Sequence, residues 1–458
     1  MTLDRHCQHI LSIDKITARL RRGRMNAMFG QELRNDETTF SRSIFSSEGV
    51  HAAEIETIFN STWLYVAHAA ELPDPGSYVV RPMGGDEAII IRGKDGVIRG
   101  FLNSCRHRGM QLCRADAGRS SRLVCPYHAW TFDSEGKLVT TSYDQHYDKA
   151  WFDELGLTPV GRIDSYKGLI FASWNDQVCP LDEHLGDLRW YLDILFARTP
   201  CGVTPLGPPQ RWVVDTNWKI AGLNFLDSQH ALRTHAGPLD AVYKAGGPPP
   251  QELAKLVDRS PQITFPQGHG IVSALRGDAP PFAGWDEALV PLFEQTLSPA
   301  QFAHFRDCPP QVGTIFPNLS WAEPLLTVST RTPPIHFLLL RLWQPRGANQ
   351  IEVTSWYFAD KEASEEWRHA SHLVAAQSFG VGGVFDEDDM EAWAGISRSI
   401  RNPISRRVPV HFNAGRGMAP IENFSGPGTA YPSLLIDRAQ LGFLTRWREL
   451  MGKAEEVA

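Results

Sequence analysis

Two short Cys/His motifs constrain this 458-residue chain more than any other feature. Cys105 and His107 form a Cys-x-His pair, and Cys125 and His128 form a Cys-x-x-His pair after a gap of 17 residues. Each motif therefore supplies one thiolate and one imidazole. Zinc also binds Cys₂His₂ sets, but zinc fingers usually pair Cys with Cys and His with His. The mixed pairs favour an iron–sulfur centre, and a zinc-containing binding module is the remote alternative.

The ligand types and the flanking sequence indicate which iron–sulfur centre this is. Two cysteines and two histidines around two irons are the ligand set of a Rieske [2Fe–2S] centre, in which the histidines hold one iron and raise the reduction potential. Gly109 and Pro126 permit tight loops whose backbone amides can bond the cluster sulfides. Strand signals at residues 88–92 and 97–102 flank a turn at 94–96. We therefore expect an antiparallel all-β module with two cluster-binding loops.

The strings around the motifs carry a family resemblance. CRHRG and CPYHAW, set between strand signals, resemble the Rieske domain of the large subunits of ring-hydroxylating oxygenases. This resemblance implies that Cys105, His107, Cys125 and His128 bind a [2Fe–2S] cluster.

Length and charge narrow the remaining classes of function. A chain of 458 residues is too long for a lone electron carrier and suggests two domains. Its hydrophobic content of 42% and charged content of 21% are those of an ordinary soluble globular protein. The formal net charge of −7 argues against nucleic acid as a partner. No apolar run approaches the ~20 residues that cross a bilayer, so we expect no membrane span.

Five of the seven cysteines lie outside the two motifs. They are Cys7, Cys113, Cys179, Cys201 and Cys308. Because they are scattered, we expect free thiols in a reducing cytoplasm rather than a disulfide framework. Cys113 lies between the two motifs, but its spacing fits neither pair, and we expect it to be a packing residue. The sequence therefore predicts a cytoplasmic protein.

The N-terminal segment carries little functional information. Residues 15–24 hold five basic side chains, but the segment lacks the apolar core of a secretory signal. We expect a solvated arm, or an extension that precedes a second candidate start at Met25.

Elements along the chain predict an α+β protein. Residues 62–182 show short strands punctuated by Gly, Asp and Pro, ending in an apolar strand at 168–174. A Pro/Gly-rich connector follows at 199–209. Beyond it the expected helices cover 218–235 and 361–379, and the expected strands cover 336–343 and 351–358. We therefore predict an N-terminal arm and helices packing with the catalytic domain (1–61), an all-β Rieske domain (62–182), and a catalytic domain with helices packed on an antiparallel sheet (183–458).

A second constellation of metal-ligating residues lies in the predicted 218–235 helix. Asp227 and His230 are spaced to share one helix face, and His235 follows about one turn later. Two neighbouring imidazoles need one carboxylate to complete the 2-His-1-carboxylate triad of non-haem Fe(II) oxygenases. Taken alone, the pair could equally be two surface histidines; its position after a Rieske motif favours mononuclear iron.

The carboxylate should come from the acidic run at residues 386–389. Acidic runs usually form a solvated face or a helix start, but this one follows a predicted apolar helix and a Gly-rich turn. The segment resembles the family's FG-x-x-G…DD element, whose second aspartate supplies the iron carboxylate. That match implies Asp389 as the ligand, with Asp388 as the fallback.

The resemblance extends from about Glu56 to the region of Trp447. It includes the string NWK…NFLDSQH…H and the string GTIFPNLS at residues 313–320. The chain departs from the family at Leu223, where a Glu is common, and at Gln229, where an aromatic residue is common. Neither position is a ligand, so these departures put pocket details in doubt and leave iron binding intact.

The resemblance implies an aromatic-ring-hydroxylating dioxygenase large (α) subunit. It would be a trimer of α chains with a small β subunit, acting with O₂ on an aromatic substrate to give a cis-dihydrodiol. Electrons would come from NAD(P)H through a separate reductase or ferredoxin, since the chain has no nicotinamide or flavin fingerprint. A Rieske monooxygenase or demethylase is the alternative, and a non-enzymatic electron-transfer protein is a more remote one.

The resemblance also assigns roles around the iron. Asp227 would link His230 to His128 of the adjacent subunit and so form an electron bridge, the alternative being a solvated helix acid or a cap. Four residues match or neighbour pocket-lining positions, with core packing as the alternative for the aromatic ones; they are Asn224, Phe225, Phe379 and Phe385.

Overall fold

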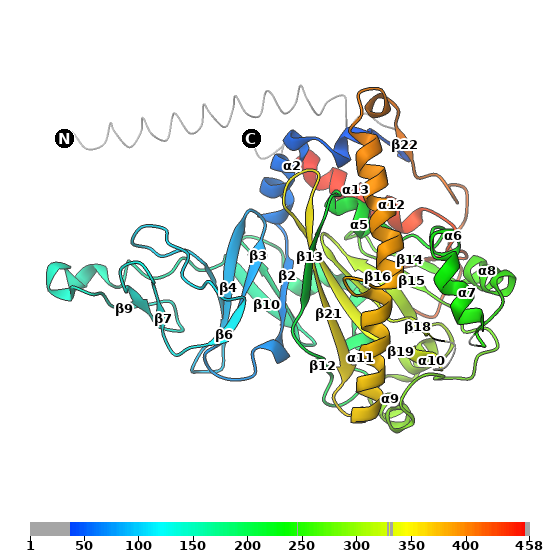
Figure 1. The fold of residues 1–458 in the computed structure, drawn as a ribbon, viewed down its shortest axis with the longest axis horizontal. Helices are drawn as coiled ribbons and strands as arrows, with labels where there is room; N and C mark the ends of the chain where they lie inside the picture. The colour runs from blue at the N-terminus through cyan, green and yellow to red at the C-terminus, as the bar shows by residue number, and fades with distance from the viewer. Residues whose placement is uncertain (1–36, 245, 328, 330–332, 454–458) are drawn as a thin grey trace.

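The computed structural model describes residues 37–244, 246–327, 329 and 333–453. The predicted arm at residues 15–24 and the candidate start at Met25 therefore lie outside the described residues. Two parts are visible in Figure 1: a small all-β part at the left, and a larger part in which helices cover a long sheet. We call the first part the β module.

Two antiparallel sheets build the β module. The four-stranded sheet has the order β5 (Ile98–Leu102), β4 (Asp86–Arg92), β3 (Ser77–Met83), β6 (Ala117–Arg119). The three-stranded sheet has the order β7 (Leu123–Val124), β8 (Thr131–Phe132), β9 (Leu138–Thr140). The predicted strands at 88–92 and 97–102 are thus β4 and β5.

Strand β4 is buried on both faces. Ile89 and Ile91 belong to the core of the β module, together with the buried thiol of Cys113. Ile90 points the other way, into the core of the larger part. Successive side chains of a strand alternate between faces, so one strand serves both cores. Cys113 occupies the packing position that its spacing suggested.

A three-stranded sheet lies between the β module and the larger part. Its order is β10 (Arg162–Tyr166), β11 (Leu169–Ser173), β2 (Leu64–His68). Strands β2 and β11 are buried along their whole length. Leu64 and Ile170 join one large core, whereas Tyr65 and Phe171 join another. The predicted strand at 168–174 corresponds to β11.

The larger part is built on a nine-stranded antiparallel sheet. Its order is β12 (Val203–Pro205), β21 (Ile351–Asp360), β20 (Leu338–Pro345), β17 (Leu319–Ala322), β16 (Pro310–Ile315), β15 (Gly270–Ser273), β14 (Gln262–Thr264), β23 (Thr429–Tyr431), with β13 (Gln210–Val214) also paired to β21. Two-stranded pairs join β1 (Thr39–Phe40) to β22 (Val410–His411) and β18 (Leu325–Leu326) to β19 (Ile335–His336). The expected strands at 336–343 and 351–358 are the long, fully buried β20 and β21.

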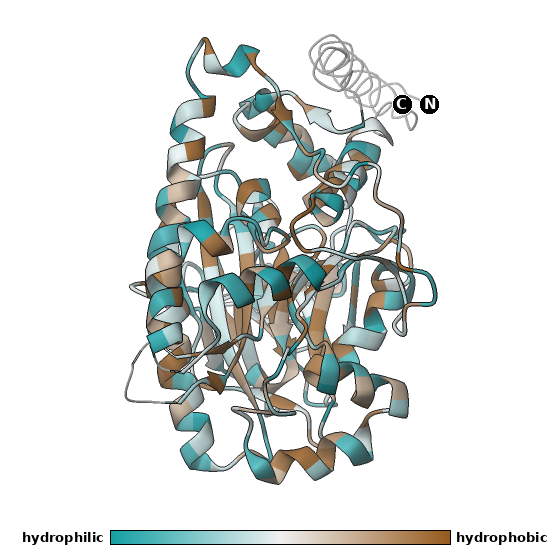
Figure 2. Ribbon diagram, turned by 90° about the vertical axis from the view of Figure 1, so that its right-hand side faces the viewer, coloured by the Kyte–Doolittle hydropathy of each residue, from teal (hydrophilic) through white to brown (hydrophobic). Residues whose placement is uncertain are grey.

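Helices cover the sheet, which confirms the predicted α+β class. They are α2 (Glu48–Glu54), α3 (Leu181–Leu185), α4 (Arg189–Phe196), α5 (Trp218–Asn224), α6 (Ala231–Thr234), α7 (Ala236–Lys244), α8 (Pro250–Arg259), α9 (Val290–Thr296), α10 (Pro299–Asp307), α11 (Glu365–Phe379), α12 (Val384–Ile400) and α13 (Arg438–Lys453). Val353 of β21 packs in the core that includes α5, α12 and α13, and Trp356 packs in the core that includes α4. Figure 2 shows the hydrophobic strands behind helices of mixed colour. Within the described residues, no helix is long and apolar enough to cross a membrane.

Residues just before the β module pack against the larger part. The carboxylate of Glu54, at the end of α2, is fully buried. It forms an ion pair with the ammonium of Lys219 and accepts hydrogen bonds from Trp218 Nε1 (2.8 Å) and Trp447 Nε1 (2.7 Å). A buried charge needs such partners, and here they tie α2 to α5 and α13.

The expected continuous helix at 218–235 is wrong. Helix α5 ends at Asn224, residues 225–230 form turns, and α6 spans only Ala231–Thr234. The side chain of Asp227 accepts a hydrogen bond from the backbone N–H of Gln229 at 2.7 Å. This local turn competes with helical hydrogen bonding. Asp227 and His230 are thus brought together by a turn and not by a shared helix face.

Candidate metal centres and substrate cavity

The two Cys/His motifs form loops with the same backbone geometry. One loop lies between β5 and β6, and the other between β7 and β8. The backbone N–H of Cys105 donates to the Met110 carbonyl, and the Cys105 carbonyl accepts from the N–H of Gly109. In the second loop, Cys125 makes the same two bonds with Trp130 and Ala129. The distances are 2.8 and 2.9 Å at Cys105, and 2.8 and 3.0 Å at Cys125. The residue that closes each turn has a positive φ, +72° at Gly109 and +54° at Ala129.

The four motif side chains converge between the loops. Cys105 and Cys125 are buried, and the rings of His107 and His128 lie 4.6 Å apart at 75°. Burial raises the pKa of the Cys105 thiol to about 11, the His107 backbone amide opposes this, and the neighbouring Cys125 thiol reinforces it. Nδ1 of His107 is buried, and no described residue hydrogen-bonds it. Two sulfurs, two imidazoles and an orphaned ring nitrogen in one place fit the ligand set of a Rieske cluster.

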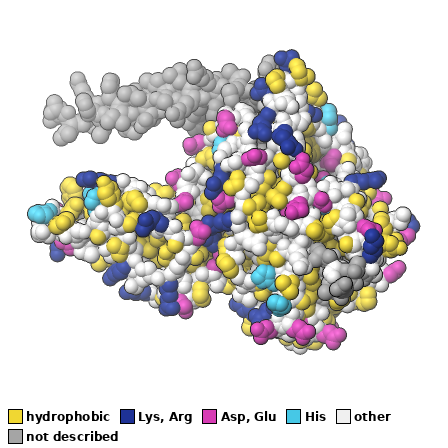
Figure 3. Space-filling view, viewed as in Figure 1, with side chains coloured by type: hydrophobic (Ala, Val, Ile, Leu, Met, Phe, Trp, Pro, Cys, Tyr) yellow, Lys and Arg dark blue, Asp and Glu magenta, His cyan; other side chains and the backbone are white. Residues whose placement is uncertain are grey.

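This end of the β module also presents apolar surface. Tyr127, between the two ligands of the second loop, is 61% exposed, and Tyr143 and Trp151 are similarly exposed. His107 and His128 are only partly buried. Figure 3 shows hydrophobic and histidine side chains on the surface of this left-hand end. The loops therefore face outward from the chain.

Three residues of the second constellation meet deeper in the molecule. His230 precedes α6, His235 follows it, and Asp389 lies in α12. Oδ1 of Asp389 is 3.4 Å from His230 Nε2 and 3.3 Å from His235 Nε2. One donor atom from each residue lies within 4.8 Å of the others. Among the described residues, the buried Oδ1 of Asp389 has no hydrogen-bond donor, so this donor set fits a metal ion with open coordination positions.

Two carboxylates contact the Nδ1 atoms of these histidines, the ring nitrogens that face away from Asp389. Asp227 Oδ2 lies 3.4 Å from His230 Nδ1, and Asp388 Oδ2 lies 3.3 Å from His235 Nδ1. Burial lowers the pKa of His230, but the contact with the Asp227 carboxylate and the charge of Asp389 outweigh it and raise the pKa. Such outer contacts fix ring orientation, so that each Nε2 faces Asp389. Asp388, the sequence's fallback ligand, therefore contacts the far side of His235.

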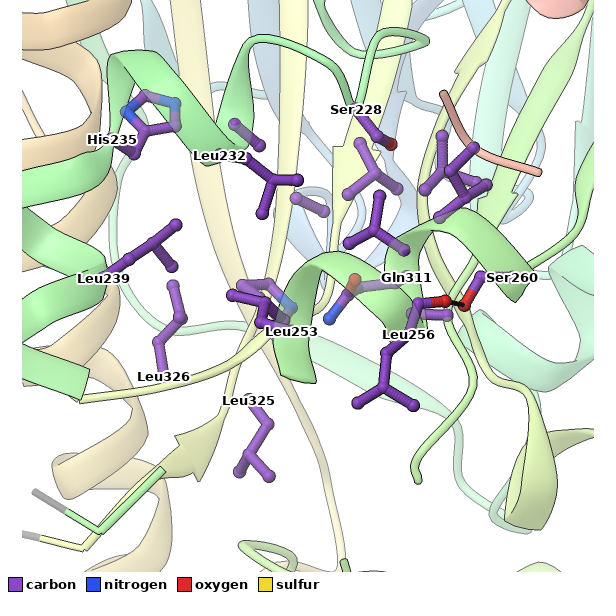
Figure 4. Close-up of a pocket in the computed structure, with 18 of the residues that line it drawn as sticks. Ser228, Leu232, His235, Leu239, Leu253, Leu256, Ser260, Gln311, Leu325 and Leu326 are labelled. Atoms are coloured by element: carbon purple, nitrogen blue, oxygen red, sulfur yellow. Dashed lines mark hydrogen bonds between the residues drawn. The ribbon is translucent and has the colours of Figure 1, made fainter. Parts of the chain in front are cut away.

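A cavity of about 340 Å³ opens beside this site. All four predicted pocket residues line it: Asn224, Phe225, Phe379 and Phe385. Phe379 and Phe385 stack at 5.1 Å and 18°, and Phe385 also contacts the His235 ring at 4.9 Å. Figure 4 shows leucine side chains along the remaining wall, among them Leu232, Leu239 and Leu326. A mostly apolar cavity with few polar groups suits a flat hydrophobic ligand.

Comparison with known proteins identifies the family of this chain. Residues 62–150 match the Rieske [2Fe-2S] domain, and residues 181–419 match the catalytic domain of the ring hydroxylating alpha subunit. The chain belongs to the ring-hydroxylating alpha-subunit family. Its members are oxygenases with a Rieske cluster domain and a catalytic domain that binds mononuclear iron.

Individual relatives of this alpha subunit cover nearly its full length. It is 31% identical to biphenyl dioxygenase subunit alpha of Paraburkholderia xenovorans, with 90% of each chain covered. It is 29% identical to the N,N-dimethyl phenylurea N-demethylase subunit alpha of a Sphingobium species, with 90% of this chain and 91% of that one covered. Naphthalene 1,2-dioxygenase from Rhodococcus sp., solved with indole bound, is 36% identical with a TM-score of 0.86, covering 93% of this chain and 98% of that one.

A buried ion pair that the sequence reasoning missed fixes α12, the helix that carries Asp389. Arg341 of β20 pairs with Asp386, one turn before Asp389, and both side chains are fully buried. Arg341 also donates to the carbonyl of Phe379 at 2.7 Å. Burial raises the pKa of Asp386 to about 6, although Arg341 opposes the rise. The sequence offered one indication of this pair, a single arginine inside an apolar strand, because a buried arginine requires a charged partner.

The departures from the family pattern at Leu223 and Gln229 lie away from the cavity. Leu223 is buried. Gln229 is exposed, and its amide donates to Asp437 Oδ1 at 3.2 Å. Neither residue lines the cavity, so neither changes its shape by direct contact.

Proposed function

We propose that this chain is the terminal oxygenase subunit of a system that dihydroxylates an aromatic ring with O₂ to a cis-dihydrodiol. His230, His235 and Asp389 would hold Fe(II), which supplies the activation of O₂. The observation that carries the proposal is the convergence of two imidazole nitrogens and Asp389 Oδ1 beside an apolar cavity. Asn224, Phe225, Phe379 and Phe385 would hold the substrate ring and keep water from it.

We propose Cys105, His107, Cys125 and His128 as the cluster ligands. Their convergence, the matching loop geometry and the orphaned His107 Nδ1 support this assignment. The loops would also supply backbone N–H groups toward the sulfurs.

We propose that Asp227 forms an electron bridge between two copies of the chain. It would accept a hydrogen bond from His230 Nδ1 and another from His128 of a second copy. Asp227 and His230 line both the substrate cavity and a second hollow of about 620 Å³, and the second hollow supports an approach from outside. The partly exposed His128 and its exposed neighbour Tyr127 support the same contact.

We propose that this head-to-tail contact closes by rotation into a ring of three chains, the assembly that the family resemblance implies. A small β subunit and a reductase or ferredoxin would complete the system. A cytoplasmic location agrees with the six described cysteines, all of which are free thiols. A functional boundary near residue 182, between a Rieske domain at 62–182 and a catalytic domain at 183–458, is consistent with the two family matches.

A demethylase or monooxygenase is the second candidate, because a phenylurea N-demethylase subunit aligns along the same length. The metal ligands do not separate the two. The test is product identification with the purified, iron-loaded protein, a surrogate reductase, ¹⁸O₂ and a panel of naphthalene, biphenyl, 2-naphthoate and an N,N-dimethyl phenylurea. The proposal expects a cis-dihydrodiol with two labelled oxygens. A phenol or dealkylated product with no dihydrodiol would contradict it.

A further inference from the structure

One corner of the substrate cavity is polar, unlike the leucine-lined remainder. Three polar residues from outside the proposed iron site reach it: Arg276 after β15, Gln311 of β16 and His336 of β19. Figure 4 shows Gln311 and His235 in one view of the cavity, with Leu253 beside Gln311. Ser260, which also lines the cavity, already bonds the Leu256 carbonyl and the Leu275 amide.

His336 is a rigid imidazole with free hydrogen-bonding capacity. Its residue is 4% exposed, and its ring stacks on Trp285 at 4.6 Å and 17°. Hydrogen bonds to Gly284 and from Ser371 hold its backbone. Neither ring nitrogen has a hydrogen-bond partner among the described residues. Leaving buried polar atoms unpaired is unfavourable, so a ligand with a complementary polar group would be stabilised at this ring.

The ring of His336 is neutral and therefore offers one N–H donor. Burial lowers its pKa well below the ordinary value, Arg276 and Arg198 lower it further, and the backbone carbonyl of Glu323 opposes this weakly. A neutral imidazole carries one donor nitrogen and one acceptor nitrogen. The side chains of Arg276 and His336 adjoin one aromatic pair: Arg276 donates to the Phe305 carbonyl, and Trp285, on which His336 stacks, contacts the Phe305 ring at 5.6 Å.

Arg276 is a cation without an ion-pair partner in the part of the chain that the structure describes. Its guanidinium lies 5.5 Å over the Phe282 ring and donates to the Phe305 carbonyl at 3.4 Å. Its Nε is buried and unpaired. The nearby carboxylates are already engaged elsewhere in the chain. Asp307 pairs with Arg306, and Glu323 pairs with Arg198.

We infer that this corner binds a carboxylate carried by the aromatic substrate, with Arg276 and His336 as its two donors. The inference rests on the proposed function and deepens it, because it selects aromatic carboxylates over unsubstituted hydrocarbons. Arg276 forms a charge-assisted hydrogen bond to one carboxylate oxygen, and the N–H of His336 binds the other. The ring then lies along the leucine-lined wall toward Asn224 and Phe385. The two donors set which end of the substrate faces the iron site.

The probes for the test are 2-naphthoate and 2-naphthamide, which match in shape and differ in charge. Dissociation constants are measured by anaerobic calorimetric titration of the Fe(II)-loaded holoenzyme. The wild-type protein should bind naphthoate about tenfold more tightly than naphthamide, and Arg276→Met should remove about tenfold or more of the naphthoate affinity only. Arg276→Lys should recover part of the loss. Arg259→Met, which removes an exposed arginine from α8, is the matched control and should change neither constant.

His336→Phe separates a binding role from a structural one. The variant keeps a flat ring against Trp285 but removes two unpartnered nitrogens, so the melting temperature should stay equal or rise. Naphthoate affinity should fall while naphthamide affinity is kept. A lower melting temperature with an unchanged ratio of affinities would show a structural histidine and overturn its assignment.

Equal wild-type affinity for the two probes, or an unchanged ratio in Arg276→Met, would overturn the carboxylate inference. Hydroxylation of naphthamide or naphthalene in a separate assay with O₂ and the surrogate reductase would then leave the proposed function intact. A holoenzyme that binds naphthoate in the expected way but hydroxylates no aromatic compound would instead contradict the proposed function.

Discussion

The two metal centres of this alpha subunit are positioned in opposite ways. Each cluster loop closes on itself through the backbone of its own cysteine and faces outward. The proposed iron site instead gathers His230 and His235 from the two ends of α6 and Asp389 from α12, beside a cavity. The first geometry depends on a few local torsion angles. The second depends on how helices are fixed against the sheet, so substitutions should damage the two centres independently.

Removing one cluster cysteine should have the largest effect. Cys125→Ser should abolish the brown colour, the Rieske electron paramagnetic resonance signal and reductase-driven turnover, because the cluster loses a thiolate. Mononuclear iron content should stay normal, since its ligands lie in other elements. Cys113→Ser is the matched control, a buried cysteine between the loops that should keep the cluster. A normal Rieske signal in folded Cys125→Ser protein would refute the ligand assignment.

Breaking the buried Arg341–Asp386 pair should weaken the proposed iron site and leave the cluster unchanged. Arg341→Met leaves Asp386 buried and uncompensated, which should lower the free energy of unfolding by about 3–5 kcal/mol. Denaturant titration should show iron release at lower denaturant, with the Rieske spectrum unchanged at that point. The double variant Arg341→Met/Asp386→Leu should recover most of the loss. Cluster loss in step with iron loss would mean that the centres are not independent.

Asp227→Asn should separate electron delivery from metal binding. The amide keeps the size of the side chain but loses the charge that supports the His230 ring. Single-turnover product formation from the reduced cluster should fall about 10–100-fold, the usual cost of an outer-contact change. Both metals and the oligomeric state should be kept. Asp240→Asn, an exposed change in α7, is the control. Near-normal single-turnover product in Asp227→Asn would exclude the bridge.

The smallest effects should come from the residues that close the cluster loops. A Cβ at Gly109 meets only Ser104 Oγ, at 3.8 Å, so Gly109→Ala costs backbone strain alone. Because Ala must adopt the left-handed conformation there, we expect the free energy of unfolding to fall by about 1 kcal/mol. Ala129→Gly at the matching position should be neutral or slightly stabilising. Thermal unfolding of the β module, followed by its cluster absorbance, measures both. If Ala129→Gly lowered the free energy of unfolding as much as Gly109→Ala does, the two loops would not share one backbone geometry.

Sequence reasoning singled out the two Cys/His loops because their information is local. The structure brings Cys105, His107, Cys125 and His128 together, and the flanking strand signals fall on β4 and β5. Their role as cluster ligands stays a prediction. The α+β class also followed from the apolar runs that became β20 and β21.

The iron site was less accessible from the sequence. Adjacent helix residues point about 100° apart, so only the rotation of α12 separates the roles of Asp388 and Asp389. That rotation is set by Arg341, which lies in a distant strand. The break at residues 225–230 was missed because the turn at Asp227 competes with an otherwise helical pattern. The polar corner takes Arg276 from the segment after β15 and His336 from β19, and no sequence spacing predicts that the two come together.

The most direct test of the account is a single turnover of the pre-reduced protein with ¹⁸O₂ and an aromatic substrate, in the wild-type protein and in Asp389→Ala. The wild-type protein should yield a cis-dihydrodiol with both oxygens labelled. Asp389→Ala should yield none, although its Rieske cluster is present and reduced. Labelled dihydrodiol from Asp389→Ala, or wild-type product whose oxygen comes from water, would contradict the proposed site and reaction.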